Sequence, residues 1–195
     1  MARALGYRKR FSAGDVVALR VDGCEIELRT IGVRGIYFPK GLSGKGLQAV
    51  ILAGLGGGLD PKLGVGDVVV DGLEHTGSIC SNDELIGPVE QKKALHEQTG
   101  AAVVEMEGDV VRKWSKAQGV RIIGVRSVSD RADQSLDGRL LGWVDGYGRP
   151  RWWKLLGSLV REPGLIVSLW KLGQNGRRAC DTLGPAVRGV ILQLG

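Results

Sequence analysis

The stretch VVEMEGDVVRKWSKAQGVRIIGVRSVSDRAD, residues 103–133, decides the fold of this chain. It contains a helix-like segment that ends at Gly119, followed by an apolar segment over residues 121–129 with the pattern of a buried strand. The strand runs directly into an acidic turn that contains Asp130 and Asp133. Open α/β sheets bind ligands at the carboxyl ends of their strands. We therefore predict a site here, built from carboxylates that can donate a proton or bind hydroxyl groups.

Strand-like and helix-like segments interleave around this stretch. A hairpin with Asp22-Gly23 at its turn is expected over residues 15–30, and buried strands over residues 49–53 and 68–70. Each of the predicted helices stops at a glycine, apart from a short basic one at the start of the chain. Their expected ranges are residues 2–11, 88–99 and 109–118, with Glu105-Met106-Glu107 at the start of the last. This order predicts a three-layer αβα domain with a mixed sheet.

The composition excludes several classes of protein. With 195 residues, 43% of them hydrophobic and 25% charged, the chain is predicted to be an ordinary globular protein. Its three cysteines form no CxxC pair, which argues against a disulfide framework or a zinc site and favours a reducing cytoplasm. Two histidines leave little material for a histidine-based metal site or catalytic triad. We expect no metal and no cofactor.

The positive charge lies in the last part of the chain. Residues 1–138 carry 18 basic and 18 acidic residues, whereas residues 139–195 carry nine basic and three acidic ones. Four of the five tryptophans fall between Trp143 and Trp170. We therefore predict an α/β domain over residues 1–138 and a basic, Trp-rich helical extension over residues 139–195, with no segment long enough to span a bilayer.

A glycine-rich cluster, GLGGGLDP over residues 54–61, follows the predicted buried strand. Without side chains, this backbone can present N–H groups to an oxygen-rich ligand, and Gly56 and Gly57 are candidate substrate-binding residues. The cluster matches neither a GxGxxG dinucleotide motif nor a phosphate-binding P-loop. Tight turning of the chain is the alternative explanation for these glycines.

Three blocks resemble signatures of one family. GLGGGLDPKLGVGDVVV, VVEMEG and VRSVSDRAD are similar, in order and approximate spacing, to motifs of the nucleoside phosphorylase/nucleosidase family, which includes purine and uridine phosphorylases and methylthioadenosine nucleosidases. The resemblance covers about residues 46–135. It implies cleavage of the N-glycosidic bond of a purine nucleoside without a cofactor, with phosphate as a possible co-substrate. It also implies a homo-oligomer.

The resemblance implies roles for particular residues. Asp130 would protonate the purine at N7, while Glu107 would accept hydrogen bonds from the ribose hydroxyls and Met106 would pack under the sugar. Leu85 and Ile86 would lie against the base. Desolvation and neighbouring carboxylates can raise the pKa of an acid at a strand end to suit this chemistry.

Structural alternatives exist for these residues. Asp130 could instead be the N-cap of a helix, and Met106 could simply fill the core. Glu105 is better explained as a structural ion-pair partner, with Arg126 as the candidate partner. The functional and the structural interpretations of these residues predict different side-chain contacts in the folded protein.

The nucleophile half of the site departs from the family pattern. From the resemblance we expect that the family's first strand and its glutamate are missing from this sequence, and the residue at the position of the family's Ser/Thr in the glycine block is Leu55. Arg34, in Gly32-Val33-Arg34-Gly35, is the one obvious candidate for binding phosphate. A catalytically impaired nucleoside-binding relative is therefore the alternative function.

The C-terminal part is similar to that of hopanoid-associated phosphorylases, through Leu141-x-x-Val144-Asp145-x-x-Gly148-Arg149-Pro150 and Leu169-Trp170-Lys171-Leu172-Gly173. Those proteins release adenine from adenosylhopane, which implies a lipid-linked nucleoside. Basic, Trp-rich helices also suit the surface of an anionic membrane, so we expect a cytoplasmic protein with possible peripheral membrane contact. The alternative is that these helices merely cover the sheet. No nucleic-acid-binding pattern is present.

Overall fold

The computed structural model describes residues 5–6, 14–73, 77–151, 153–155, 157, 162 and 164–195. Most of the helix expected over residues 2–11 lies outside the described residues. The same holds for Trp152 and for much of the helical segment predicted to follow it.

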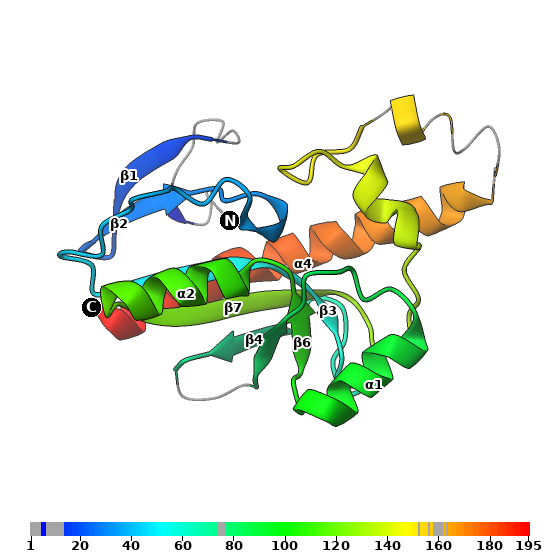
Figure 1. The fold of residues 1–195 in the computed structure, drawn as a ribbon, viewed down its shortest axis with the longest axis horizontal. Coiled ribbons are helices and arrows are strands. Elements are labelled where there is room, and N and C mark those ends of the chain that lie inside the picture. Colours follow the sequence, from blue (N-terminus) through cyan, green and yellow to red (C-terminus); the bar gives the residue numbers. More distant parts are fainter. Residues whose placement is uncertain are drawn as a thin grey trace.

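The described elements combine strands and helices along the chain, with helices concentrated in its second half (Figure 1). In chain order they are β1 (Val16–Val21), β2 (Cys24–Arg29), η2 (Val33–Gly35), β3 (Ala49–Gly58), β4 (Val68–Asp71), β5 (Ile79–Ser81), α1 (Val89–Thr99), β6 (Val103–Glu105), α2 (Gly108–Gln118), β7 (Arg121–Asp130), η3 (Gly138–Trp143) and α4 (Leu165–Leu194).

A mixed five-stranded sheet organises the fold, with strand order β4-β7-β3-β6-β5. The two long central strands, β3 and β7, are parallel, whereas β4 and β6 run antiparallel to them and β5 is parallel to β6. Ile123 and Val125 of β7 pack against α4, while Arg126 points toward the start of α2, so helices cover both faces of the sheet. This arrangement confirms the predicted αβα architecture with a mixed sheet.

The predicted hairpin is confirmed as β1 and β2. Asp22 and Gly23 both have positive φ, 50° and 92°, as a two-residue type I′ turn requires. Arg188 of α4 binds the Asp22 carboxylate with two hydrogen bonds of 2.8 Å. Val21 at the end of β1 joins the same core cluster as the C-terminal half of α4. The hairpin and the main sheet therefore share that helix.

Helix α4 is one continuous helix of 30 residues. Its C-terminal half buries an apolar face made of Ala179, Leu183, Val187, Val190 and Ile191. Its N-terminal half exposes Ile166, Val167 and Trp170 instead. No helix among the described residues is long and apolar enough to cross a membrane.

Strand β3 extends further than the sequence indicated. The prediction ended it at Ala53, but Gly54 to Gly58 continue the strand and pair with both β7 and β6. Glycine has little tendency to form strands on its own, so this extension depends on its two neighbours. The short strands β5 and β6 were missed, and Glu105 lies at the end of β6 rather than at the start of a helix.

We predict that Leu183→Ala lowers the free energy of unfolding by about 2–5 kcal/mol, because it leaves a cavity between α4 and β7. Leu192→Ala, at an exposed position of the same helix, should change it by less than about 0.5 kcal/mol. Urea titration of both variants measures the difference. Equal losses would show that α4 is not held through this face.

Candidate active site

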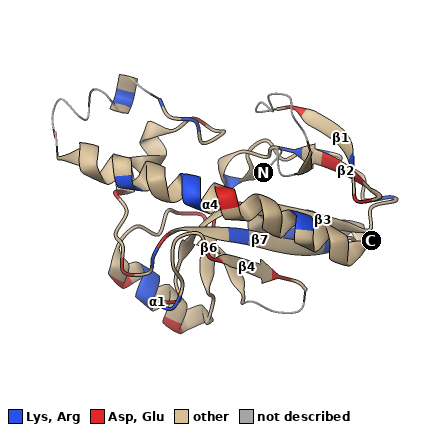
Figure 2. Cartoon of the chain, turned by 180° about the vertical axis from the view of Figure 1, so that it is seen from behind, with Lys and Arg blue, Asp and Glu red and all other residues tan. Residues whose placement is uncertain are grey.

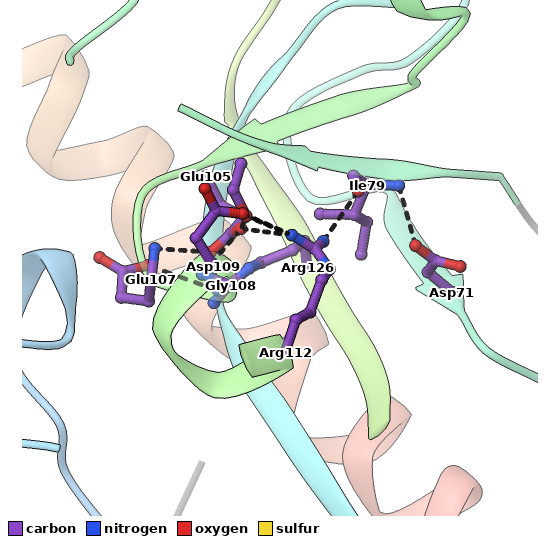
Figure 3. Close-up of polar contacts among 9 residues, drawn as sticks. Asp71, Ile79, Glu105, Glu107, Gly108, Asp109, Arg112 and Arg126 are labelled. Carbon is purple, nitrogen blue, oxygen red and sulfur yellow. Dashed lines mark hydrogen bonds and ion pairs between the residues drawn. The ribbon is translucent and has the colours of Figure 1, made fainter. Parts of the chain in front are cut away.

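A buried ion pair connects the end of β6 to the middle of β7. Arg126 Nη2 donates to Glu105 Oε2 at 2.5 Å, and both side chains are nearly inaccessible to solvent. Figure 3 shows these side chains pointing toward each other from the two strands. The structure thus confirms the interpretation of Glu105 as the partner of Arg126.

Further donors converge on the Glu105 carboxylate. The backbone N–H groups of Glu107 and Gly108, at the start of α2, both donate to it at 2.8 Å, and the Ser81 hydroxyl donates as well. Burial acts to raise the pKa of Glu105, but the Arg126 charge and these hydrogen bonds outweigh it and hold the pKa below its ordinary value. Glu105 is therefore a fixed anion that positions the first turn of α2.

Glu107 lies beside this pair and remains accessible, with 20% of its side chain exposed. Its Oε2 is 3.4 Å from Arg126 Nη2, and its Oε1 accepts a 3.2 Å hydrogen bond from the backbone N–H of Arg34. Burial raises the pKa of Glu107; the Arg126 charge opposes this shift and the Glu105 charge adds to it. This carboxylate is the one in the cluster that ligand hydroxyls can reach.

Arg34 contacts this cluster through its backbone N–H group. It has a positive φ of 58° in η2, and the following Gly35 packs so closely on Val110 that an added Cβ would lie 2.4 Å from Val110 Cγ1. The backbone N–H of Arg34 thus lies next to Glu107, while its place in a substrate site stays a prediction. Its role in phosphate binding stays a prediction.

Asp130 ends β7 in a separate, fully buried cluster. Its side chain is 2% exposed and forms an ion pair with Lys92 Nζ of α1, which is 0% exposed. The Ser129 hydroxyl donates to Asp130 Oδ1 at 2.7 Å. Asp130 is thus the end of a strand, and the alternative reading of it as a helix N-cap is wrong: the next helical turn, η3, has Asp137 as its N-cap.

Two glycines of β3 separate the clusters. An added Cβ at Gly56 would lie 3.6 Å from Arg126 Cβ, whereas one at Gly57 would lie 3.3 Å from Asp130 Oδ2. The β3–β7 register shifts between these glycines, which brings Asp130 opposite Gly57. Because neighbouring strand residues face opposite sides, Arg126 and Asp130 lie on different faces of the curled sheet. Among the described residues, no hydrogen bond or ion pair joins Asp130 to Glu107.

The remaining candidates have simpler surroundings. Met106 is half-buried between Glu105 and Glu107 in sequence. Leu85 is half-buried too, while Ile86 packs into a core cluster around Leu59 and Val104. The Leu85-Ile86 segment is irregular rather than a strand.

Leu55, the residue at the position where the family has Ser or Thr, is part of the core. Leu55 packs against the cluster that contains Val125 and Leu183, and therefore belongs to the α4 side of the sheet. In the part of the chain that the structure describes, no group of three or more His, Cys, Asp or Glu side chains could hold a metal ion.

A cleft of about 410 Å³ lies beyond the Asp130 end of the site. Its walls come from the segment after β7 and from the N-terminal half of α4, and they include Gln134, Leu136, Leu140, Trp143, Leu169 and Leu172. Gln134 connects the cleft to Asp130, since its carbonyl oxygen accepts a 2.9 Å hydrogen bond from Lys92 Nζ.

Comparisons with known proteins agree with this arrangement. Residues 74–148 match the family model described as the phosphorylase superfamily, a segment that includes Glu105, Glu107, Arg126 and Asp130. No curated protein sequence matches the chain significantly.

Solved structures show the same fold. The 5′-methylthioadenosine/S-adenosylhomocysteine nucleosidase of Helicobacter pylori is 16% identical and covers 93% of this chain and 89% of its own, with a TM-score of 0.60. The corresponding nucleosidase of Colwellia psychrerythraea, solved with adenine, is 16% identical over 67% of this chain and 79% of its own, with a TM-score of 0.51. The fold is therefore that of nucleosidases and phosphorylases.

Sequence reasoning missed Lys92 as part of the site. In the polar helix α1, only its spacing marks it, because Val89, Lys92 and Leu95 recur every three residues on the face toward the sheet. A lysine on the apolar face of a helix needs a buried partner.

We predict that Glu105→Gln lowers the free energy of unfolding at pH 7 by about 3–5 kcal/mol, because Arg126 loses its main buried counter-charge. Since folding lowers the pKa of Glu105, its contribution is present above the ordinary glutamate pKa and is lost as the pH falls through the lowered value. Urea unfolding at pH 7 and at pH 4 should therefore show a smaller pH dependence in the variant. Glu97→Gln, which alters an exposed pair with Lys93, is the control. An unchanged pH dependence in Glu105→Gln would contradict this assignment.

Proposed function

We propose that this protein cleaves the N-glycosidic bond of a purine nucleoside, by phosphorolysis or hydrolysis. The observation that carries the proposal is the pair of carboxylates reached through the adjacent glycines Gly56 and Gly57: Gly57 packs against the buried Asp130, and Gly56 packs against Arg126, which contacts the accessible Glu107. The fold and the superfamily match support it. The substrate class is carried over from the resemblance described above.

In this proposal the nucleoside binds at Gly56-Gly57, where the β3–β7 register shifts and the two clusters lie on either side of adjacent residues, and it reaches both clusters. Its ribose hydroxyls donate to Glu107, with Met106 under the sugar, and the base points toward Asp130. A carboxylate has about four acceptor positions, and Asp130 uses one on each oxygen for Ser129 and Lys92, so it retains capacity for a base nitrogen. Protonation at N7 would let the purine leave as a neutral base.

The acceptor of the ribosyl group is the less supported half of the proposal. Leu55 is committed to the core and supplies no hydroxyl group. Arg34 is the candidate for binding phosphate, since its backbone already contacts Glu107. A catalytically impaired nucleoside-binding protein is therefore the second candidate function, and the Leu55 position is the observation that favours it.

We predict that Asp130→Asn lowers adenine release by about 10²–10⁴-fold, the usual contribution of a general acid, while nucleoside affinity changes little. Adenosine and 5′-methylthioadenosine, each with and without inorganic phosphate, are the substrates. Chromatography of the products separates free ribose from ribose 1-phosphate and so distinguishes the two reactions.

Two outcomes would decide against this function. Wild-type turnover that survives Asp130→Asn unchanged would exclude Asp130 as the acid. Nucleoside binding by calorimetry without any base release from the wild type would establish the non-catalytic alternative.

We further propose that the substrate carries a lipid, as the C-terminal resemblance to hopanoid-associated phosphorylases suggests, and that the protein contacts an anionic membrane surface from the cytoplasm. Ile166, Val167 and Trp170 form an exposed apolar stripe on α4, and Trp153 is 83% exposed. Basic residues outnumber acidic ones nine to three in residues 139–195, and Figure 2 shows several of them along α4. Apolar contact and attraction to anionic headgroups would act together.

We predict that the protein co-sediments with phosphatidylglycerol vesicles and not with phosphatidylcholine vesicles at low salt, and that Trp170→Ser weakens this binding several-fold. Leu192→Ser, which also changes an exposed apolar residue of α4 but lies at its C-terminal end, is the matched control. Equal binding to both vesicle types would remove the electrostatic part of the proposal. Equal losses in both variants would remove the assignment to the N-terminal half of α4.

A further inference from the structure

Lys92 is a buried cation with all its donors used. Its side chain is 0% exposed, and its ammonium group donates to Asp130 Oδ2, to the Arg131 carbonyl oxygen at 2.8 Å and to the Gln134 carbonyl oxygen at 2.9 Å. An ammonium group has three donors, so each of them has one acceptor here. The neighbouring Lys93, by contrast, is 75% exposed. The chain therefore places one particular lysine against the carboxylate of Asp130.

No other cation contacts this carboxylate among the described residues. The β7 side contributes the Ser129 hydroxyl, and the β3 and β6 sides contribute Gly57 and Val104. Asp133 is a further carboxylate on this segment, but it is exposed and bound by Arg131, which lowers its pKa, and the Lys92 charge adds to that lowering. On α1, His96 is occupied with the Ala101 carbonyl oxygen. Lys92 is thus the cation that pairs directly with Asp130 among the described residues.

This pairing creates a chemical requirement. A carboxylate beside an ammonium group holds a negative charge, yet the proposed reaction needs Asp130 to donate a proton. Bulk water does not reach the carboxylate readily, because Asp130 is only 2% exposed. Two groups among the described residues donate a hydrogen bond to Asp130, the Ser129 hydroxyl and Lys92, and Lys92 is the charged donor of the two.

We propose that Lys92 supplies the proton that Asp130 delivers to the leaving purine, an inference that rests on the proposed nucleosidase or phosphorylase function. One proton moves from Lys92 Nζ to the Asp130 carboxylate, and one moves from Asp130 to N7 as the C1′–N9 bond breaks and its electron pair passes to the base. Lys92 is then a neutral amine, Asp130 a carboxylate again and the purine neutral. The acceptor, water or hydrogen phosphate, loses a proton when it bonds to C1′, and that proton restores the ammonium group.

Lys92 would thus act through Asp130 and touch no substrate atom. A purely structural role, in which Lys92 only ties α1 to the end of β7, predicts different kinetics. Under a structural role, any cation of similar reach restores turnover. Under the relay, arginine fails, because a guanidinium group does not give up its proton in proteins.

The test uses the full chain and the variants Lys92→Met, Lys92→Arg and Lys93→Met. Each is assayed on adenosine and on 4-nitrophenyl β-D-ribofuranoside, whose leaving group departs as a phenolate anion without needing a proton. Thermal melting establishes which variants fold, and the pH dependence of kcat/KM is measured on both substrates.

We expect both Lys92 variants to lose at least 10²-fold in kcat on adenosine and to remain within tenfold of the wild type on the nitrophenyl riboside. In Lys92→Met the alkaline limb of kcat/KM for adenosine should move, because the ammonium group that supplies the proton is no longer present. Lys93→Met should match the wild type on both substrates. If one Lys92 variant fails to fold, the other still distinguishes the two roles by its leaving-group dependence.

Three results would overturn the relay: rescue by Lys92→Arg on adenosine, equal losses on the two substrates, or an alkaline limb that does not move in Lys92→Met. Failure of the proposed function looks different. In that case the wild type releases no adenine, or Asp130→Asn releases it normally, whatever Lys92 does.

Discussion

The arrangement of charges in this protein depends on the glycines at the C-terminal end of β3. These are Gly54, Gly56 and Gly57, which pair with β7, and a Cβ added at Gly54 would lie 2.0 Å from Arg126 Nη1. The space that these glycines leave is occupied by Arg126 on one face and by Asp130 on the other. The absence of side chains at these positions thus admits the charged side chains of β7 to the interior, where they form the buried ion pairs of the site.

Burying a charge costs free energy unless the charge has a partner. The cluster around Arg126 and the cluster around Asp130 pair their charges in different ways. Arg126 faces two carboxylates, so Glu105 is fixed as an anion while Glu107 keeps a raised pKa and an exposed edge. Asp130 has a single cation, Lys92, which shares its remaining donors with backbone carbonyl groups. The first cluster is suited to holding hydroxyl groups, and the second to holding one mobile proton. Their separation along β7 keeps the Arg126 charge away from the proposed acid.

The strongly periodic parts of the fold could be predicted from the sequence, because local chemistry specifies them. Asp22-Gly23 demands a hairpin turn, and Gly100 and Gly119 end their helices in the left-handed conformation. The short strands β5 and β6 could not, since three residues carry no period and depend on pairing with each other and with β3. The Glu105–Arg126 pair was predictable because Arg126 lies in the apolar pattern of β7, where a charged residue needs a buried partner. Lys92 was not, because its partner lies 38 residues away and only burial distinguishes it from Lys93.

The C-terminal helix α4 both packs on the sheet and presents an exposed apolar surface. Through Ser127 and Thr182, whose hydroxyl oxygens are 2.9 Å apart, α4 is tied to β7 on the face opposite Arg126. Its other half forms one wall of the cleft beside Gln134 and then exposes its apolar stripe. Because Gln134 also binds Lys92, a molecule that moved this half of α4 would act on the Lys92–Asp130 pair through a single intervening residue. The helix is therefore both a structural element of the sheet and, through Asn175 and Gln134, a physical link between its exposed half and the Lys92–Asp130 pair.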